Sequence, residues 1–197
     1  MERPILFNTE MVRAILDGRK TQTRRIVKGL DGLNVYRAEP SEDAYESLDE
    51  WDFFYGGSLV GGGMFDAIQS EKAPCAVGDV LYVRETWQYI EESDSDGFYI
   101  YAADHKDHAE WNWRPSIHMP RSAARIFLRV KDVRVERLDD MTEEDAIAEG
   151  FPDSPACTDS PLERFSVLWD KTIKRNDLRE YGWHANPWVW VIEFERV

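Results

Sequence analysis

Short stretches in which apolar and polar residues alternate are separated along this chain by stretches with helical spacing. Alternation predicts strands, because successive side chains of a strand point to opposite faces, whereas spacing of three or four residues predicts helices. Strands are predicted at 80–84, 98–103 and 188–195, and a bent strand or hairpin at 125–138. Apolar residues share one face of the last strand, and we expect that face to lie in the core.

Three helices are predicted from residues that favour helix ends. The first is capped at residues 8–9 and ends at Gly18. The second begins after Thr142 and ends at Gly150, and the third begins after Ser160 with proline at its first position. Threonine and serine cap helix N-termini, proline suits the first helical position, and glycine favours the C-terminal end.

Short strands with irregularly interspersed helices and no internal repeat indicate an α+β fold, and we expect a small mixed β-barrel with flanking helices. Residues 1–197 are expected to form a single domain. Residues 29–63 hold seven of the twelve glycines, eight acids and one base, which predicts a long inserted loop, poorly ordered or lid-like. A glycine-rich phosphate cradle at Gly61–Gly63 is the alternative interpretation, but no Gly-Lys-Ser/Thr follows it.

Charge is distributed unevenly along this acidic chain. The net charge is −14, yet the segment from Arg13 to Lys28 carries +5, which leaves −19 for everything else. A concentrated positive segment on an acidic protein indicates a local anion or nucleotide site. The overall acidity argues against general DNA binding, which needs many basic contacts.

Composition also indicates the kind of protein and the cellular compartment to expect. Hydrophobic residues make up 43% of the chain and aromatic residues 13%, as expected for a folded globular protein. No apolar run is long enough to span a membrane, and no secretory leader pattern is visible, so we expect no membrane association. Cys75 and Cys157 are expected to be free thiols, which fits a reducing, cytoplasmic location.

Several segments resemble the ASCH domain, a β-barrel of the PUA-like group. They are Gly18-Arg19-Lys20-Thr21-x-Thr23-x-Arg25, Gly78-Asp79-Val80-Leu81, Thr142 to Gly150, and Val191 to Phe194. Segments 4–12, 83–87 and 113–121 resemble the phage- and prophage-associated branch of that family. The resemblance implies one PUA-like domain with insertions at about 29–73 and 87–120.

The resemblance also implies a reaction. Smaller bacterial ASCH proteins are amidohydrolases that remove acyl groups from N4-acylated cytidines with a lysine, a threonine and a glutamate. These residues correspond to Lys20, Thr23 and Glu149, with Glu143 and Glu144 as alternatives for the glutamate. The implied enzyme uses no metal or cofactor and acts on a modified nucleoside or a short RNA.

In this chemistry Thr23 is the nucleophile, Lys20 the base and Glu149 the acid for the leaving amine. A neutral lysine is needed, and nearby positive charge lowers a lysine pKa. We therefore expect Arg19, Arg24 and Arg25 to keep Lys20 neutral, with Arg25 or a backbone N–H stabilising the oxyanion. The alternative is a solvated basic turn. The expected substrate-binding residues are Arg19, Arg24, Arg25, Arg84, Glu85, Trp113 and Arg114.

Two other functions stay open. One is a non-catalytic reader of RNA or a modified nucleotide, in which tryptophan and arginine planes stack on a base. The other is a phage accessory protein whose acidic insert contacts a protein partner. The residues Asp104, His105, Asp107 and His108 are compatible with a metal, but their spacing is loose and favours a solvated loop.

Overall fold

A five-stranded mixed sheet forms the centre of the computed structural model, which describes all residues except 31, 42–48, 61–62, 93–94, 106–110 and 155–156. The strands are β1 (Glu2–Leu6), β2 (Gln22–Ile26), β6 (Val80–Arg84), β9 (Phe127–Arg137) and β10 (Trp188–Arg196). Their order is β1-β6-β9-β10-β2. The β1–β6 pair is parallel and the other pairs are antiparallel.

The α+β class predicted from the sequence is therefore confirmed. In the described residues β1 and β2 remain the two edges of the sheet, and no backbone pairing between them closes a barrel. The side chain of Arg25 on β2 reaches across to β1, where its Nη2 donates to the carbonyl of Leu6 at 3.0 Å. The PUA-like barrel thus stays a prediction.

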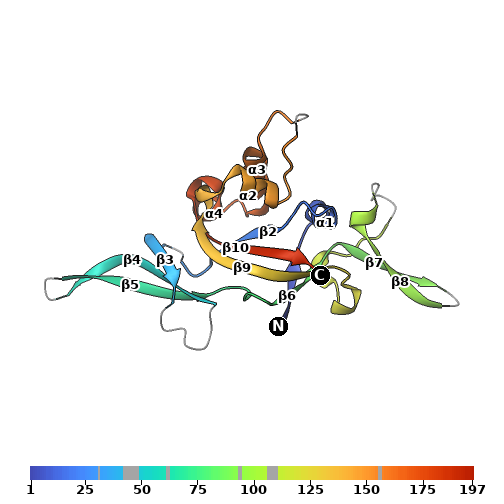
Figure 1. The fold of residues 1–197 in the computed structure, drawn as a ribbon, viewed down its shortest axis with the longest axis horizontal. Coiled ribbons are helices and arrows are strands. Elements are labelled where there is room, and N and C mark those ends of the chain that lie inside the picture. The colour runs from blue at the N-terminus through green and yellow to red at the C-terminus, as the bar shows by residue number, and fades with distance from the viewer. Residues whose placement is uncertain (31, 42–48, 61–62, 93–94, 106–110, 155–156) are drawn as a thin grey trace.

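Four α-helices flank the sheet in the described part of the chain: α1 (Thr9–Leu16), α2 (Glu143–Ala148), α3 (Pro161–Thr172) and α4 (Leu178–Tyr181). The predicted caps are confirmed, since Asn8, Thr142 and Ser160 each accept a hydrogen bond from a first-turn backbone N–H. Helices α2, α3 and α4 lie together on one side of the sheet (Figure 1). Single 3₁₀ turns occupy Ala102–Asp104, Ser116–His118, Arg121–Ala123, Leu138–Asp140 and Trp183–Ala185.

The prediction of a long loop at residues 29–63 is wrong. Strands β3 (Val35–Pro40), β4 (Glu50–Val60) and β5 (Gly63–Lys72) form a three-stranded antiparallel sheet, which projects to one side as an arm. Aromatic packing explains why this segment forms a sheet instead of a loop. Phe53 is fully buried, and its ring meets the rings of Trp188 and Trp190 edge-on with centres 6.1 and 6.2 Å apart. Gly61 and Gly62, considered for a phosphate cradle, lie outside the described residues.

A two-stranded hairpin, β7 (Trp87–Glu92) with β8 (Ser95–Tyr101), projects on the opposite side from the arm (Figure 1). The strand predicted at 98–103 thus exists but ends at Tyr101. Strand β9 is one continuous strand, and its register with β10 shifts between Glu193 and Phe194. The hairpin alternative is not observed.

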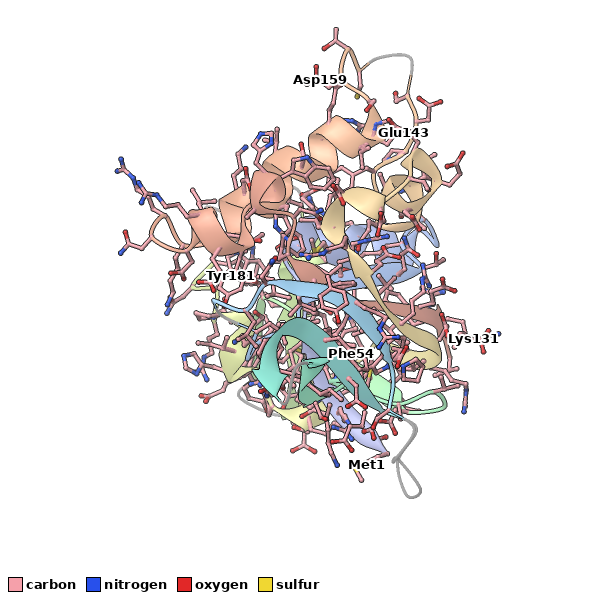
Figure 2. All side chains as sticks on the ribbon, turned by 90° about the vertical axis from the view of Figure 1, so that its left-hand side faces the viewer. Met1, Phe54, Lys131, Glu143, Asp159 and Tyr181 are labelled. Carbon is pink, nitrogen blue, oxygen red and sulfur yellow. The ribbon has the colours of Figure 1, made fainter. Side chains whose placement is uncertain are left out.

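Strand β10 organises the core because its two faces pack against different elements. Val189 and Val191 belong to the cluster beneath α3, whereas Ile192 and Phe194 belong to the cluster beneath α1. Figure 2 shows α2 and α3 stacked above the sheet, with the arm on the near side. Among the described residues, no helix combines the length and apolar character needed to cross a bilayer.

Candidate functional site

The basic segment lies where α1 ends, in the turn and strand that follow. Backbone hydrogen bonds join this turn to the end of α2, with Thr21 N donating to Ala148 O at 2.8 Å. Gly150, which ends α2, has a φ of +105° and packs against Lys20 and Ala14, where a Cβ atom would come within 2.9 Å of the Ala14 Cβ. A left-handed glycine thus allows the end of α2 to approach Lys20 closely.

Lys20 and Glu149 form an ion pair in the interior. Each residue is only 2% exposed, and Lys20 Nζ lies 2.5 Å from Glu149 Oε2 and 2.9 Å from the Glu149 carbonyl oxygen. Burial lowers the pKa of Lys20, while the Glu149 carboxylate opposes that shift. The charges of Arg25 and Arg24 lower the same pKa to a smaller extent. Desolvation, rather than the arginine cluster, is therefore the main reason that the neutral amine becomes accessible.

Arg24 joins this pair to a larger buried network. Its side chain is fully buried and contacts three carboxylates, at 2.5 Å for Glu136, 3.3 Å for Asp145 and 3.5 Å for Glu149. Arg19 forms a separate pair with Asp17 at 2.8 Å. Asp17 is already counted in the +5 of the segment, and carboxylates from outside it pair with Arg13, Lys20 and Arg24, so the fold does not show the concentrated positive patch expected.

Thr23 and Arg25 share one face of β2, as alternate residues of a strand do. Arg25 Nη1 donates to Thr23 Oγ1 at 3.1 Å. The ring of Phe7 lies between the two basic groups, 5.4 Å from Arg25 Cζ and 5.5 Å from Lys20 Nζ. The guanidinium is thereby fixed beside the threonine hydroxyl, and no carboxylate pairs with Arg25 among the described residues.

A cavity of about 560 Å³ opens beside these side chains. Thr23, Arg24, Arg25 and Glu149 line its polar side. Helix α3 supplies an apolar wall of Phe165, Leu168, Trp169 and Ile173. A pocket of this size, with an apolar wall facing convergent polar groups, is typical of small-molecule sites. Lys20 is not among the described residues that line it, and it contacts the cavity only through Glu149.

The alternatives for the catalytic glutamate lie elsewhere. Glu143 and Glu144 are exposed at the start of α2 and line a different surface hollow, together with Cys157. Of these acidic residues, Glu149 is the one that the fold brings to Lys20 and Thr23. The structure thereby brings all three residues named by the resemblance to one place, although Lys20 Nζ makes no hydrogen bond to Thr23 Oγ1.

Four of the predicted binding residues are not brought to this cavity. Arg84 donates to the carbonyl of Met119 at 2.9 Å, and the buried Glu85 pairs with Arg125 at 2.8 Å. Arg114 lies over the ring of Trp87, with its Cζ 5.3 Å from the ring centre. Trp113 packs against His105 and Trp111 with ring centres 5.8 and 6.4 Å away.

Arg19 also lies outside the cavity lining, because it donates to Gly150 O at 2.9 Å and holds the turn after α2. His105 packs against tryptophan rings. Asp104, of the same metal-compatible group, pairs with Arg125 at 2.6 Å, and Asp107 and His108 lie outside the described residues. Within the part of the chain that the structure describes, three or more metal-ligating side chains do not gather anywhere.

Sequence reasoning missed the carboxylates that neutralise Arg24. Asp145 has the spacing of a capping residue and also serves as one, since it accepts from the backbone of Thr142. Glu136 lies on a strand whose alternation identifies buried positions but not their partners. The apolar residues of α3 have the helical spacing of a core face, and that spacing carries no signal that part of the face borders a cavity.

Comparisons with known proteins add no relatives. No family model matches the chain, and neither a curated protein nor a solved structure is significantly similar to it.

Proposed function

We propose that this protein is an amidohydrolase of the ASCH type that removes the acyl group from N4-acylated cytidine or a related modified nucleoside. The observation that carries the proposal is the meeting of Lys20, Thr23 and Glu149. Lys20 and Glu149 are in direct contact, and Thr23 and Glu149 line the same cavity of about 560 Å³. Its apolar wall offers surface for a base and an acyl group.

The Lys20–Glu149 contact supplies both proton-transfer groups. Moving one proton from Lys20 Nζ to Glu149 across 2.5 Å converts a charged pair into a neutral amine and a carboxylic acid. Burial lowers the pKa of Lys20 and so reduces the free-energy cost of this transfer, because a charged amine loses hydration in the interior. The pair then offers a base for Thr23 and an acid for the departing amine without any change in its total proton count.

In the proposed reaction, Thr23 Oγ1 bonds to the acyl carbon and its proton passes to Lys20. The side chain of Lys20 must turn toward Thr23 for this step, since its Nζ points to Glu149 in the resting site. Arg25, already 3.1 Å from Thr23 Oγ1, stabilises the oxyanion. The carbon–nitrogen bond then breaks as N4 takes the proton from Glu149, and water hydrolyses the acyl-threonine ester to a carboxylic acid.

The test is incubation of the purified protein with N4-acetylcytidine and longer N4-acylcytidines, with cytidine release followed by chromatography. Thr23→Val and Lys20→Met keep side-chain volume and are expected to lower kcat by about a thousandfold or more. Lys131→Met, which changes an exposed lysine on β9, is the matched control and is expected to match the parent protein. Absence of cytidine with every substrate would refute the proposal.

One observation favours the second function, a non-catalytic reader of a modified nucleotide. Lys20 Nζ already has two acceptors, both on Glu149, so the pair is satisfied without Thr23. A reader predicts that N4-acetylcytidine binds to the parent protein and is recovered intact. Equilibrium binding measured beside the turnover assay separates the two functions.

A further inference from the structure

A second pocket lies on the other side of Arg25. Its volume is about 590 Å³, and Leu6, Arg25 and Ile26 line both it and the first cavity. It occupies the opening between the edge strands β1 and β2, beside the end of β5. The two cavities are therefore neighbours divided by a thin wall, in which the Arg25 side chain spans from β2 to the Leu6 carbonyl.

The lining of the second pocket combines an apolar interior with basic groups. Ile5, Leu81, Trp190 and Ile192 are buried core residues that present apolar surface to it. Its basic residues are Arg3, Arg25, Lys28, Lys72 and Arg84. The only acidic residue among the described lining residues is Glu71, whose carboxylate packs over Gly29 and accepts from Gln69. Such a concentration of positive charge is unusual in a chain of net charge −14.

Lys28 and Lys72 are the two basic residues of the pocket that are available to a ligand, because the others already have partners in the protein. Arg3 is paired with Asp79, and Arg84 donates to Met119 O. Lys28 and Lys72 are exposed, and neither has an ion-pair partner among the described residues. They come from different parts of the chain, the end of β2 and the end of β5, and both line the same pocket. The fold thus brings two unpaired lysines to the rim of an apolar hollow.

We propose that the second pocket holds the nucleotide adjacent to the modified cytidine, so that the substrate is a short single-stranded RNA rather than a free nucleoside. The inference rests on the proposed function and deepens it. Two neighbouring pockets can each hold one nucleoside of a dinucleotide whose halves are joined by a phosphodiester. The apolar interior takes the second base, and Lys28 and Lys72 contact the phosphate, as basic groups do in single-strand sites.

An acyl chain that extended into the second pocket would need the apolar interior but not the lysines. Substitution of the two lysines therefore distinguishes a second nucleotide, whose binding it would weaken, from an acyl chain, whose binding it would not. Two unpaired lysines at one opening predict binding of a short segment with a shallow dependence on salt. Each phosphate contact adds about 0.7 to the slope of log affinity against log salt for a single strand.

The test is the affinity of a fluorescein-labelled RNA trinucleotide with N4-acetylcytidine at its centre, measured by anisotropy at two salt concentrations. Lys28→Glu/Lys72→Glu is expected to weaken binding about tenfold or more and to reduce the salt slope. Lys28→Gln/Lys72→Gln is expected to show a smaller loss. Lys131→Glu/Lys174→Glu makes the same change in net charge on exposed residues outside the pocket and is the matched control.

Equal affinities for the Lys28→Glu/Lys72→Glu variant and the control would overturn the inference, as would failure of the parent protein to bind the trinucleotide. The binding comparison does not depend on whether the protein releases cytidine. If the paired variants differ as expected but no cytidine is ever released, the second pocket stands and the amidohydrolase does not. If cytidine is released but the paired variants bind alike, only the second pocket is refuted.

Discussion

Replacing Glu149 with glutamine is expected to destabilise the fold by about 3 kcal/mol near neutral pH. Removing one partner of a buried ion pair costs about 3–5 kcal/mol, because the other charge is left in the interior. Arg24 keeps Glu136 and Asp145 as partners, whereas Lys20 loses the carboxylate that balances its charge and keeps neutral oxygen acceptors, such as the backbone carbonyl of residue 149, 2.9 Å from its Nζ. The substitution therefore mainly leaves the charge of Lys20 unbalanced. Lys20 can become neutral by releasing its proton, so we expect a loss of stability at the lower end of the range of about 3–5 kcal/mol.

The dependence on pH follows from that release. Without the carboxylate, the main effect that opposes desolvation is lost, so the pKa of Lys20 in the folded variant is lower than in the parent protein. The unfolded chain, with an ordinary lysine pKa near 10.4, then binds more protons than the folded variant. The free energy of unfolding of the variant therefore rises with pH up to about 10.4. The difference from the parent protein is expected to be larger at about pH 6 than at about pH 9.

Urea unfolding followed by fluorescence of the eight tryptophans measures these differences. Glu144→Gln, at an exposed position on the same helix, is the control and is expected to change stability by less than about 0.5 kcal/mol. Adding Lys20→Met to Glu149→Gln is expected to recover part of the loss, since it removes the stranded charge. A loss below about 1 kcal/mol at low pH, or a loss that grows with pH, would refute the reasoning.

Three further outcomes are expected. Phe53→Ala should cost about 3–5 kcal/mol in urea unfolding, because Phe53 is fully buried between the arm and two tryptophans; a negligible cost would mean that the arm does not pack there. Gly150→Ala should lower Tm and, if the proposed reaction is right, kcat, since φ is +105° and the new Cβ would crowd Ala14. An aromatic disulfide reagent should titrate only the exposed Cys157 in the native protein and Cys75 after unfolding, because Cys75 is buried and burial raises its pKa to about 11.

Local signals in the sequence were sufficient for the helices. The caps at Asn8, Thr142 and Ser160 depend only on residues within the first turn of each helix, and all three are observed. The prediction of a loop at residues 29–63 was wrong because the arm is ordered by contacts that are distant in the sequence. Its glycines and acids indicate a loop, whereas the residue that orders it, Phe53, packs on Trp190, far along the chain. Contacts of such long sequence separation leave no local pattern.

The same distinction applies to the site. The position of Lys20 and Thr23 at the head of a strand follows from the helix end at Gly18 and the alternation after it. The sequence could not show that Arg24 would be neutralised by Glu136, because that pair joins residues on β2 and β9, which are not adjacent in the sheet. The positive charge expected as one surface patch is therefore mostly paired with carboxylates, and among the described residues Arg25 and Lys28 form no ion pair.

The opening between β1 and β2 explains why both cavities lie where they do. If these edges paired through their backbones, the sheet would close and the space on either side of Arg25 would narrow. Instead, the Arg25 side chain makes the connection to Leu6, with Thr23 held by the same guanidinium. Arg25 thus lines both hollows together with Leu6 and Ile26, and its guanidinium also contacts the proposed nucleophile. The proposed pair of linked nucleotides, with its phosphodiester toward Lys28 and Lys72, would use both hollows, whereas a free nucleoside requires only one of them.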